Sequence, residues 1–157
     1  MSDLDVRIVK LPAMRVVCVN GFGEGPEGMA FDKMKAWAKA HNLPKGPHRI
    51  FGYNNPDPSP GSPNYGYDVW LTVDESVQAD GDVRIIDFPG GLYAVARIDV
   101  KDPEDEIPNA WQKLVKWMEA SKYRHGQHQW LEEHIGPLDE MGGEHPFTLD
   151  LHLPITE

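Results

Sequence analysis

The sequence predicts an α+β domain in which two similar halves each contribute strands to a mainly antiparallel sheet and one helix packed on it. Three observations predict this fold class: a long internal repeat, an amphipathic helical stripe in each half, and short strands with alternating apolar residues. Each half is a strand–helix–strand–strand unit with one extra leading strand. At 157 residues the chain fits a single domain, 1–157, with pseudo-repeats at about 4–73 and 83–154.

The repeat consists of four segments that recur in the same order. Three segments match at an offset of 80 residues: 30–37 with 110–117, 48–53 with 128–133, and 67–73 with 147–153. The leading segment, 6–12, matches 83–89 at an offset of 77. This period is longer than the roughly 20–50 residues of solenoid repeats, so we interpret it as a half-domain copied once. Gly52 and Glu132 fall at matched positions.

The first half begins with two expected strands, 6–11 and 14–19, with a turn at Pro12-Ala13. A helix follows from near Pro26, a residue tolerated at helix starts, to about His41. Its apolar stripe has helical spacing and comprises Phe31, Met34, Trp37 and Ala38. Two further strands, 49–54 and 67–73, flank the loop 55–66, whose four prolines exclude a central strand or helix. We interpret this loop as a surface excursion, with a lid as the alternative.

The second half repeats this order. The expected strands 83–88 and 92–98 form a hairpin around Pro89-Gly90-Gly91. Acidic residues between Asp102 and Glu106 suit the N-terminus of a helix that runs to about Ser121. The stripe of this helix comprises Trp111, Leu114, Val115 and Met118. The last two strands, 129–135 and 147–153, flank a second loop rich in glycine and proline.

The strand 129–135 carries two adjacent glutamates, which must point to opposite faces of the sheet. Alternation places Glu132 with Trp130 and His134, and places Leu131 with Glu133. A carboxylate beside an indole inside a sheet is costly unless it meets a cation, a donor or a proton. We expect Glu132 to be the buried glutamate and Glu133 the solvated one.

The last strand of each half has one regular apolar side. Leucine and valine at alternate positions of 69–73 and 149–153 predict the side that meets the helices. Trp70 is therefore expected on the opposite face.

Composition and charge exclude several classes of protein. A net charge of −10 argues against a nucleic-acid surface, because phosphate binding needs a basic face. The single cysteine, Cys18, excludes an internal disulfide and is interpreted as part of the core. Neither a signal peptide nor an apolar run of roughly 18 residues is visible. We therefore expect a cytoplasmic protein without a membrane partner.

No motif predicts a cofactor or a metal ion. The glycines at 23, 25 and 28 match the dinucleotide fingerprint in letters only, because a hairpin and a helix replace its parallel strand–helix–strand unit. Five late histidines lack zinc-site spacing and are interpreted as solvated: His125, His128, His134, His145 and His152. No Ser-His-Asp or Cys-His arrangement supports a Ser or Cys nucleophile.

Eight stretches together resemble a known family. In order they are VRIVKLPAMRVV, KAWAKAHNL, IFGYNNP, YDVWLTV, FPGGLYAVARI, AWQKLVKWMEASKY, WLEEHI and LDLHLPI. They are similar to the GyrI-like small-molecule-binding domain, the effector-binding module of some AraC- and MerR-type multidrug regulators, which also occurs alone in SbmC-like proteins. The resemblance implies a ligand groove between the two copies and an acid that follows a leucine. Leu131-Glu132 fits this pattern, whereas His134 stands where tyrosine is usual.

The resemblance implies a small-molecule-binding function. We expect a stand-alone module, since no DNA-binding helices precede Val6, that binds or sequesters amphipathic, cationic aromatic drugs or toxins. The expected ligand-binding residues are Glu132, which neutralises the cation, with Trp130, Trp70, Tyr53, Tyr93, Phe147, His134 and Trp111. Two alternatives stay open: a hydrolase that opens cyclopropane-containing toxins with Glu132 as catalytic acid/base, and a gyrase-inhibitor-like interaction protein. The protein partner and the oligomeric state are left open.

Overall fold

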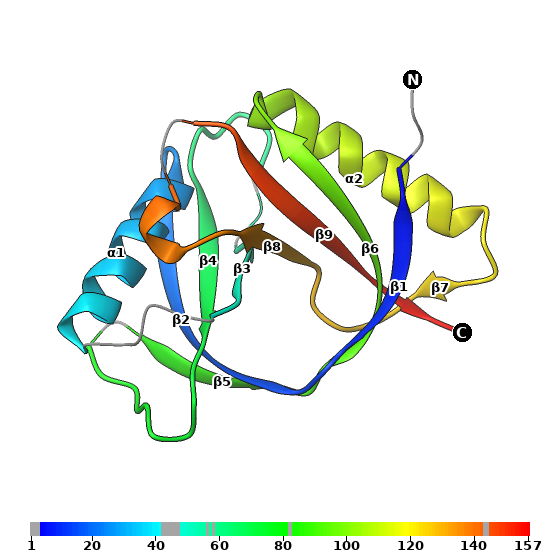
Figure 1. Cartoon of the computed structure of the whole chain (residues 1–157). Helices are drawn as coiled ribbons and strands as arrows, with labels where there is room; N and C mark the ends of the chain where they lie inside the picture. The colour runs from blue at the N-terminus through cyan, green and yellow to red at the C-terminus, as the bar shows by residue number, and fades with distance from the viewer. Residues whose placement is uncertain (1–3, 42–47, 56, 58, 82, 143–144) are drawn as a thin grey trace. The chain divides into compact units, whose positions relative to one another are not determined.

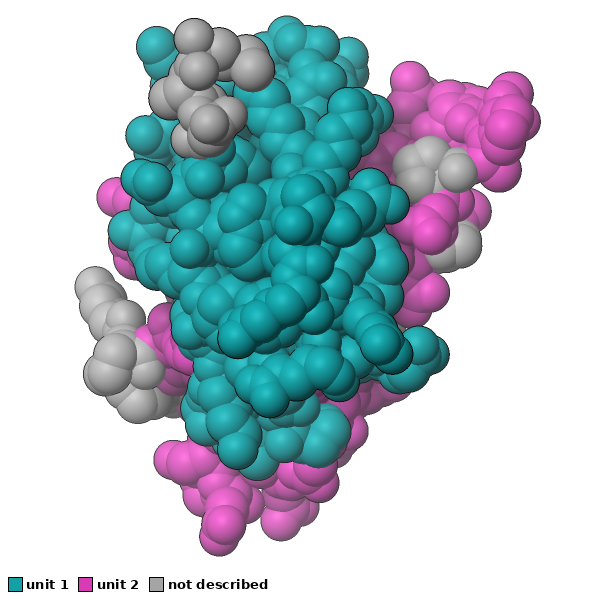
Figure 2. Space-filling view, turned by 90° about the vertical axis from the view of Figure 1, so that its right-hand side faces the viewer, with its two compact units in different colours: residues 1–13, 89–135, 145–157 teal, residues 14–88, 136–144 magenta. Residues whose placement is uncertain are grey.

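The computed structural model describes residues 4–41, 48–55, 57, 59–81, 83–142 and 145–157. The chain divides into two compact units, which are coloured separately in Figure 2. Unit 1 comprises Met1–Ala13, Pro89–Ile135 and His145–Glu157, and unit 2 comprises Met14–Phe88 and Gly136–Glu144. Each unit combines one α-helix with antiparallel strands (Figure 1), so the predicted α+β class is confirmed.

Unit 1 is a sheet with helix α2 (Pro103–Glu119) packed on one face. The strands lie in the order β1 (Val6–Leu11), β6 (Gly91–Val100), β9 (Phe147–Thr156) and β8 (Leu131–Ile135), and β7 (Arg124–His125) pairs with β9. The main core residues alternate along β9 and follow helical spacing along α2: Leu149, Leu151, Leu153, Ala110, Leu114 and Met118. The predicted leucine side of β9 therefore does meet the helix.

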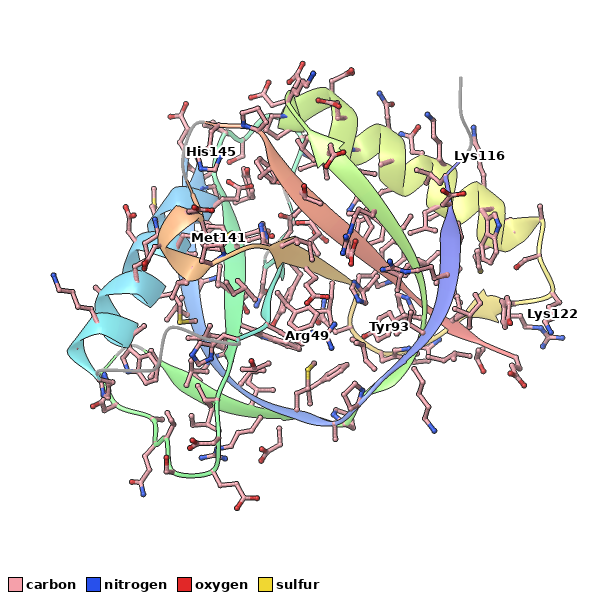
Figure 3. All side chains as sticks on the ribbon, in the orientation of Figure 1. Arg49, Tyr93, Lys116, Lys122, Met141 and His145 are labelled. Carbon is pink, nitrogen blue, oxygen red and sulfur yellow. The ribbon has the colours of Figure 1, made fainter. Side chains whose placement is uncertain are left out.

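Unit 2 has the same plan, with helix α1 (Pro26–Ala40) on its sheet. The strands lie in the order β3 (Ile50–Asn54), β4 (Tyr65–Thr72), β2 (Met14–Gly23) and β5 (Arg84–Phe88). Val69 and Leu71 of β4 pack against the helical stripe, which leaves Trp70 on the other face as predicted. The short 3-10 helix η1 (Leu138–Glu140) leads to Met141 (Figure 3), which completes this core.

The leading strand of each sequence repeat pairs with a strand of the other repeat. β1 pairs with β6, and β5 pairs with β2. The hairpin expected between 83–88 and 92–98 is therefore wrong, and so is the expected return of 6–11 onto 14–19. A glycine permits this path: Gly90 has a φ of 84°, and a Cβ there would overlap the carbonyl oxygen of Leu11. The chain can therefore lie against the end of β1 before it enters β6.

The strand registers show which positions of the two repeats correspond. Three pairs of facing residues in unit 1 each have an equivalent pair in unit 2. Arg7–Val95 corresponds to Arg84–Cys18, Arg97–Asp150 corresponds to Asn20–Asp68, and Glu132–Leu151 corresponds to Gly52–Val69. Gly52 and Glu132 correspond, as the sequence repeat predicts. The predicted match of the last strands is off by two residues, because Asp68 corresponds to Asp150 and not to Thr148.

Candidate functional site

The faces of β8 follow from its pairing with β9. Residues opposite one another in an antiparallel pair lie on the same face. Glu132 lies opposite Leu151, a core residue beneath α2, so Glu132 is on the α2 side of the sheet. Glu133 lies opposite Asp150 and shares the other face with His152. Within unit 1, this second face is the one without a helix.

Glu132 belongs to an aromatic group beside α2. Its Oε2 accepts a hydrogen bond of 3.0 Å from the indole N–H of Trp111. The ring of Trp130 lies 5.3 Å from that of Trp111 and stacks on His125 at 5.7 Å, with 39% of Trp130 exposed. Glu132 therefore lies beside Trp111, in a setting that is only partly buried.

Glu133 is the buried glutamate of the pair, with 8% of its surface exposed. The expectation that Glu132 is buried and Glu133 solvated is therefore wrong. Oε1 of Glu133 lies 3.7 Å from Nε2 of His152, which is 2% exposed. Because Nδ1 of His152 lies 2.9 Å from the carbonyl oxygen of Asp150, which can only accept, Nδ1 carries a hydrogen. Nε2 is thus the ring nitrogen that faces Glu133.

Tyr93 of β6 shares this helix-free face (Figure 3). Its ring lies edge-on to His128 at 4.7 Å and to His152 at 5.5 Å. Its hydroxyl donates a hydrogen bond of 2.5 Å to the carbonyl of Gln129, and burial raises its pKa. Tyr93 therefore remains a neutral phenol at physiological pH, and its buried ring lies against His152, the residue that contacts Glu133.

Asp150 anchors the same face with two arginines. Its carboxylate accepts hydrogen bonds from Arg97 at 2.8 Å and from Arg7 at 3.1 Å. Burial raises the pKa of Asp150, but these bonds outweigh burial and hold the pKa below its ordinary value. The charge of Asp150 is therefore balanced by two arginines. Glu133 is also a buried carboxylate on the helix-free face of unit 1.

Unit 2 gathers a second aromatic group on the face away from α1. Trp70 contacts Tyr53 edge-on at 5.4 Å and Phe88 at 5.4 Å. Burial, followed by the nearby Asp68, raises the pKa of Tyr53, so it stays a neutral phenol. The indole nitrogen of Trp70 is buried and has no hydrogen-bond partner among the described residues. Such a donor is costly to bury unless a water or a ligand meets it.

The contacts described above join the predicted ligand-binding residues into four groups, three in unit 1 and one in unit 2. Glu132, Trp111 and Trp130 lie together; Tyr53 and Trp70 lie together; and Tyr93 lies with His128 and His152. The fourth group joins His134 to Phe147, whose rings stack at 6.3 Å beside the α2 core.

Sequence reasoning missed Glu133 and His152 as site candidates. The signal was present in the last strand, where Asp150 and His152 alternate with the leucines that face α2. Pairing that polar side with β8 would have selected Glu133.

Neither a group of metal-ligating side chains nor a membrane-spanning helix is found among the described residues. No three His, Cys, Asp or Glu side chains among them are grouped closely enough to hold a metal ion. In the same part of the chain, no helix combines the length and apolar character needed to cross a bilayer.

The glycine motif at 23, 25 and 28 lies between strand β2 and helix α1. β2 pairs antiparallel with β4, and Gly25 caps α1 with a φ of 67°. This context differs from the parallel dinucleotide-binding unit.

One comparison with known proteins identifies a family. The model of the GyrI-like small molecule binding domain matches residues 4–155. Among curated proteins, the search finds no match. The DNA-bound regulator EcmrR superposes with a TM-score of 0.71 and 14% identity, over 98% of this chain and 57% of EcmrR. The chain therefore spans little more than half of EcmrR.

Two other solved structures match over nearly their whole length. A hydrolase from Listeria innocua has a TM-score of 0.59 and 11% identity, over 99% of this chain and 94% of that protein. SAV2435 bound to tetraphenylphosphonium has a TM-score of 0.58 and 11% identity, over 98% and 94% of the two chains. At these identities the likeness concerns the fold.

Proposed function

Because the chain belongs to the GyrI-like family of small-molecule-binding domains, we propose that it binds an organic cation with aromatic rings and sequesters it. The similar SAV2435 structure holds tetraphenylphosphonium, a cation of this kind. The chain also carries a net charge of −10, which favours the approach of cations over anions.

The observation that carries the proposal is the buried Glu133 on the helix-free face of unit 1. Removing a carboxylate from water is costly, and a nearby cation offsets that cost. A large aromatic cation spreads its charge and is weakly hydrated, so it gives up little solvation when it meets Glu133. Tyr93 lies on the same face and contacts His152, the partner of Glu133, and the face of such an aromatic ring attracts a cation.

We assign the role of the acid to Glu133 rather than to Glu132. Glu132 lies on the α2 side of the sheet and is only partly buried, whereas Glu133 is buried on the other face. The two glutamates are neighbours in sequence on opposite faces of one strand, which makes each the matched control for the other.

The test is calorimetric titration with tetraphenylphosphonium of the wild type, Glu133→Gln and Glu132→Gln. We expect Glu133→Gln to weaken binding by about tenfold or more, equivalent to about 1.4 kcal/mol. Glu132→Gln should stay within about threefold of the wild type, an effect of under about 1 kcal/mol. The neutral analogue triphenylphosphine oxide should bind both variants and the wild type equally. Equal cation affinity in the wild type and Glu133→Gln would reject the assignment, and a loss confined to Glu132→Gln would move the site to the α2 side.

A second candidate function is hydrolysis of strained electrophiles such as cyclopropane-containing toxins. It is favoured by the contact of 3.7 Å between Glu133 and His152, because carboxylates and imidazoles are the usual side chains of general acid–base catalysis. The assay follows product formation from a cyclopropane-bearing alkylator. Turnover by the wild type that does not exceed the Glu133→Gln background would reject it. The gyrase-interaction alternative and the groove between the repeats stay predictions.

A further inference from the structure

Unit 2 contains a cavity of about 350 Å³ on the α1 side of its sheet. Ile50 of β3 and Leu71 of β4 line it, and both also belong to the α1 core. Tyr53 and Trp70 point to the opposite face of the same two strands. The cavity is therefore separate from the aromatic group of unit 2, and it contains no residue assigned to cation binding above.

The cavity has an apolar wall and a cationic side. Ala38 from α1 and Leu138 from η1 join Ile50 and Leu71 as its apolar lining. Its volume is within the range of about 300–1,000 Å³ that is typical of small-molecule sites. A flat ring or a short alkyl chain fits such a lining, because burial of its apolar surface is favourable.

The charged lining comes mainly from α1, where Lys35 and Lys39 lie one helical turn apart. Like charges at this spacing destabilise a helix. The C-terminal helix dipole compensates Lys39 in the last turn, but acts less on Lys35. His48 also lines the cavity, held by a hydrogen bond of 2.9 Å to the carbonyl of Thr72. Asp139 is the one carboxylate among the described residues that line the cavity.

We propose that this cavity binds an amphipathic organic anion, with its carboxylate or sulfonate between Lys35 and Lys39 and its apolar body against Ile50 and Leu71. An anion there relieves the repulsion between the two lysines. This selectivity is opposite to that of the cation site proposed for unit 1, so one protein would hold two ligand classes. The inference goes beyond the proposed function and does not depend on it.

The test uses 8-anilinonaphthalene-1-sulfonate, an aromatic sulfonate whose fluorescence rises in apolar surroundings. We expect saturable binding at one site, weakened about fivefold or more by Lys35→Glu and by Lys39→Glu, since each change replaces attraction with repulsion. Lys33→Glu makes the same charge change at an exposed position of the same helix, outside the cavity lining. It should change affinity less than about twofold. Ala38→Leu, which fills the cavity without altering charge, should also weaken binding.

Competition separates this site from the cation site. Octanoate should displace the probe, whereas octyltrimethylammonium and saturating tetraphenylphosphonium should not. Displacement by tetraphenylphosphonium, or an equal loss of affinity in Lys33→Glu and Lys39→Glu, would overturn the proposal. Circular dichroism of each variant shows whether a loss reflects unfolding. If tetraphenylphosphonium fails to bind while the sulfonate binds as described, only the function proposed for unit 1 fails.

Discussion

Gly52 of β3 and Glu132 of β8 occupy the same register position in their sheets, opposite Val69 and Leu151. Their surroundings differ. The ring of Tyr67 lies so close to Gly52 that a Cβ there would overlap it. At Glu132 the side chain is present and accepts the indole N–H of Trp111. The strand pairing at this position is therefore the same in both units. The side chain that contacts this position comes from a strand in unit 2 (Tyr67 of β4) and from a helix in unit 1 (Trp111 of α2).

Gly52→Ala should destabilise the protein, because the new methyl group must displace the Tyr67 ring from a buried position. Overpacking of this kind costs about 1–3 kcal/mol. Urea unfolding monitored by circular dichroism measures the change. Gly28→Ala is the control: a Cβ at this position in α1 meets nothing within 4 Å. It should stabilise the helix by about 0.5–1 kcal/mol. Equal stability of Gly52→Ala and the wild type would show that Tyr67 moves freely.

Local patterns were sufficient to predict the elements and their faces. Helical spacing predicted α1 to about His41 and α2 to about Ser121, within two residues of the observed ends at Ala40 and Glu119. Alternation along β4 predicted the face of Trp70. These properties depend on the period of a single segment, which sequence records directly.

Strand partners and burial could not be read in the same way. The linker at Pro12-Ala13 fits a hairpin equally well as a connection between strands that do not pair, and the observed pairing depends on contacts remote in sequence, such as Leu11 opposite Gly91. Alternation shows that Glu132 and Glu133 point apart, but not which face α2 covers. The repeat also misaligned β4 with β9 by two residues, which concealed the match of Asp68 with Asp150.

Asp150→Asn should weaken the fold at neutral pH by about 2 kcal/mol, because it removes charge-assisted hydrogen bonds from Arg97 and Arg7. The folded pKa of Asp150 is lowered, so its contribution is present above the unfolded pKa of about 3.9 and is lost as pH falls through the folded value. The two proteins should therefore converge in stability at strongly acidic pH. Chemical denaturation of both proteins at several pH values measures this difference in the free energy of unfolding.

The control for Asp150 is Asp87→Asn, since the Asp87 side chain is 82% exposed and meets Arg15 only at 3.6 Å. A surface pair of this kind contributes less than about 1 kcal/mol. If both substitutions have the same effect at neutral pH, the bonds of Asp150 to Arg7 and Arg97 do not stabilise unit 1.

Cys18 should be nearly inert to thiol reagents in the folded protein. Burial, followed by the charge of Asp68, raises its pKa to about 11, although Arg84 lies 3.3 Å from the sulfur. At pH 8 the reactive thiolate is therefore scarce, and labelling should be at least about 100-fold slower than in the unfolded chain. Ellman's reagent measures the rate without ambiguity, because the chain has one cysteine. Native labelling as fast as that in denaturant would contradict the burial of this thiol.

His134 should make the protein lose stability as the medium turns mildly acidic. Burial lowers the pKa of His134 to about 3, well below the value of about 6.5 in an unfolded chain. Between these values the unfolded chain takes up a proton that the folded state does not, so acid favours unfolding. His134 should contribute a loss of up to about 1.4 kcal/mol for each pH unit below about 6.5. His134→Phe retains a ring against Phe147 and should flatten this dependence, whereas His145→Phe, at an exposed position, should leave it unchanged. Stability curves from pH 4 to 7 that are parallel for the wild type and His134→Phe would show that His134 is protonated in the folded protein.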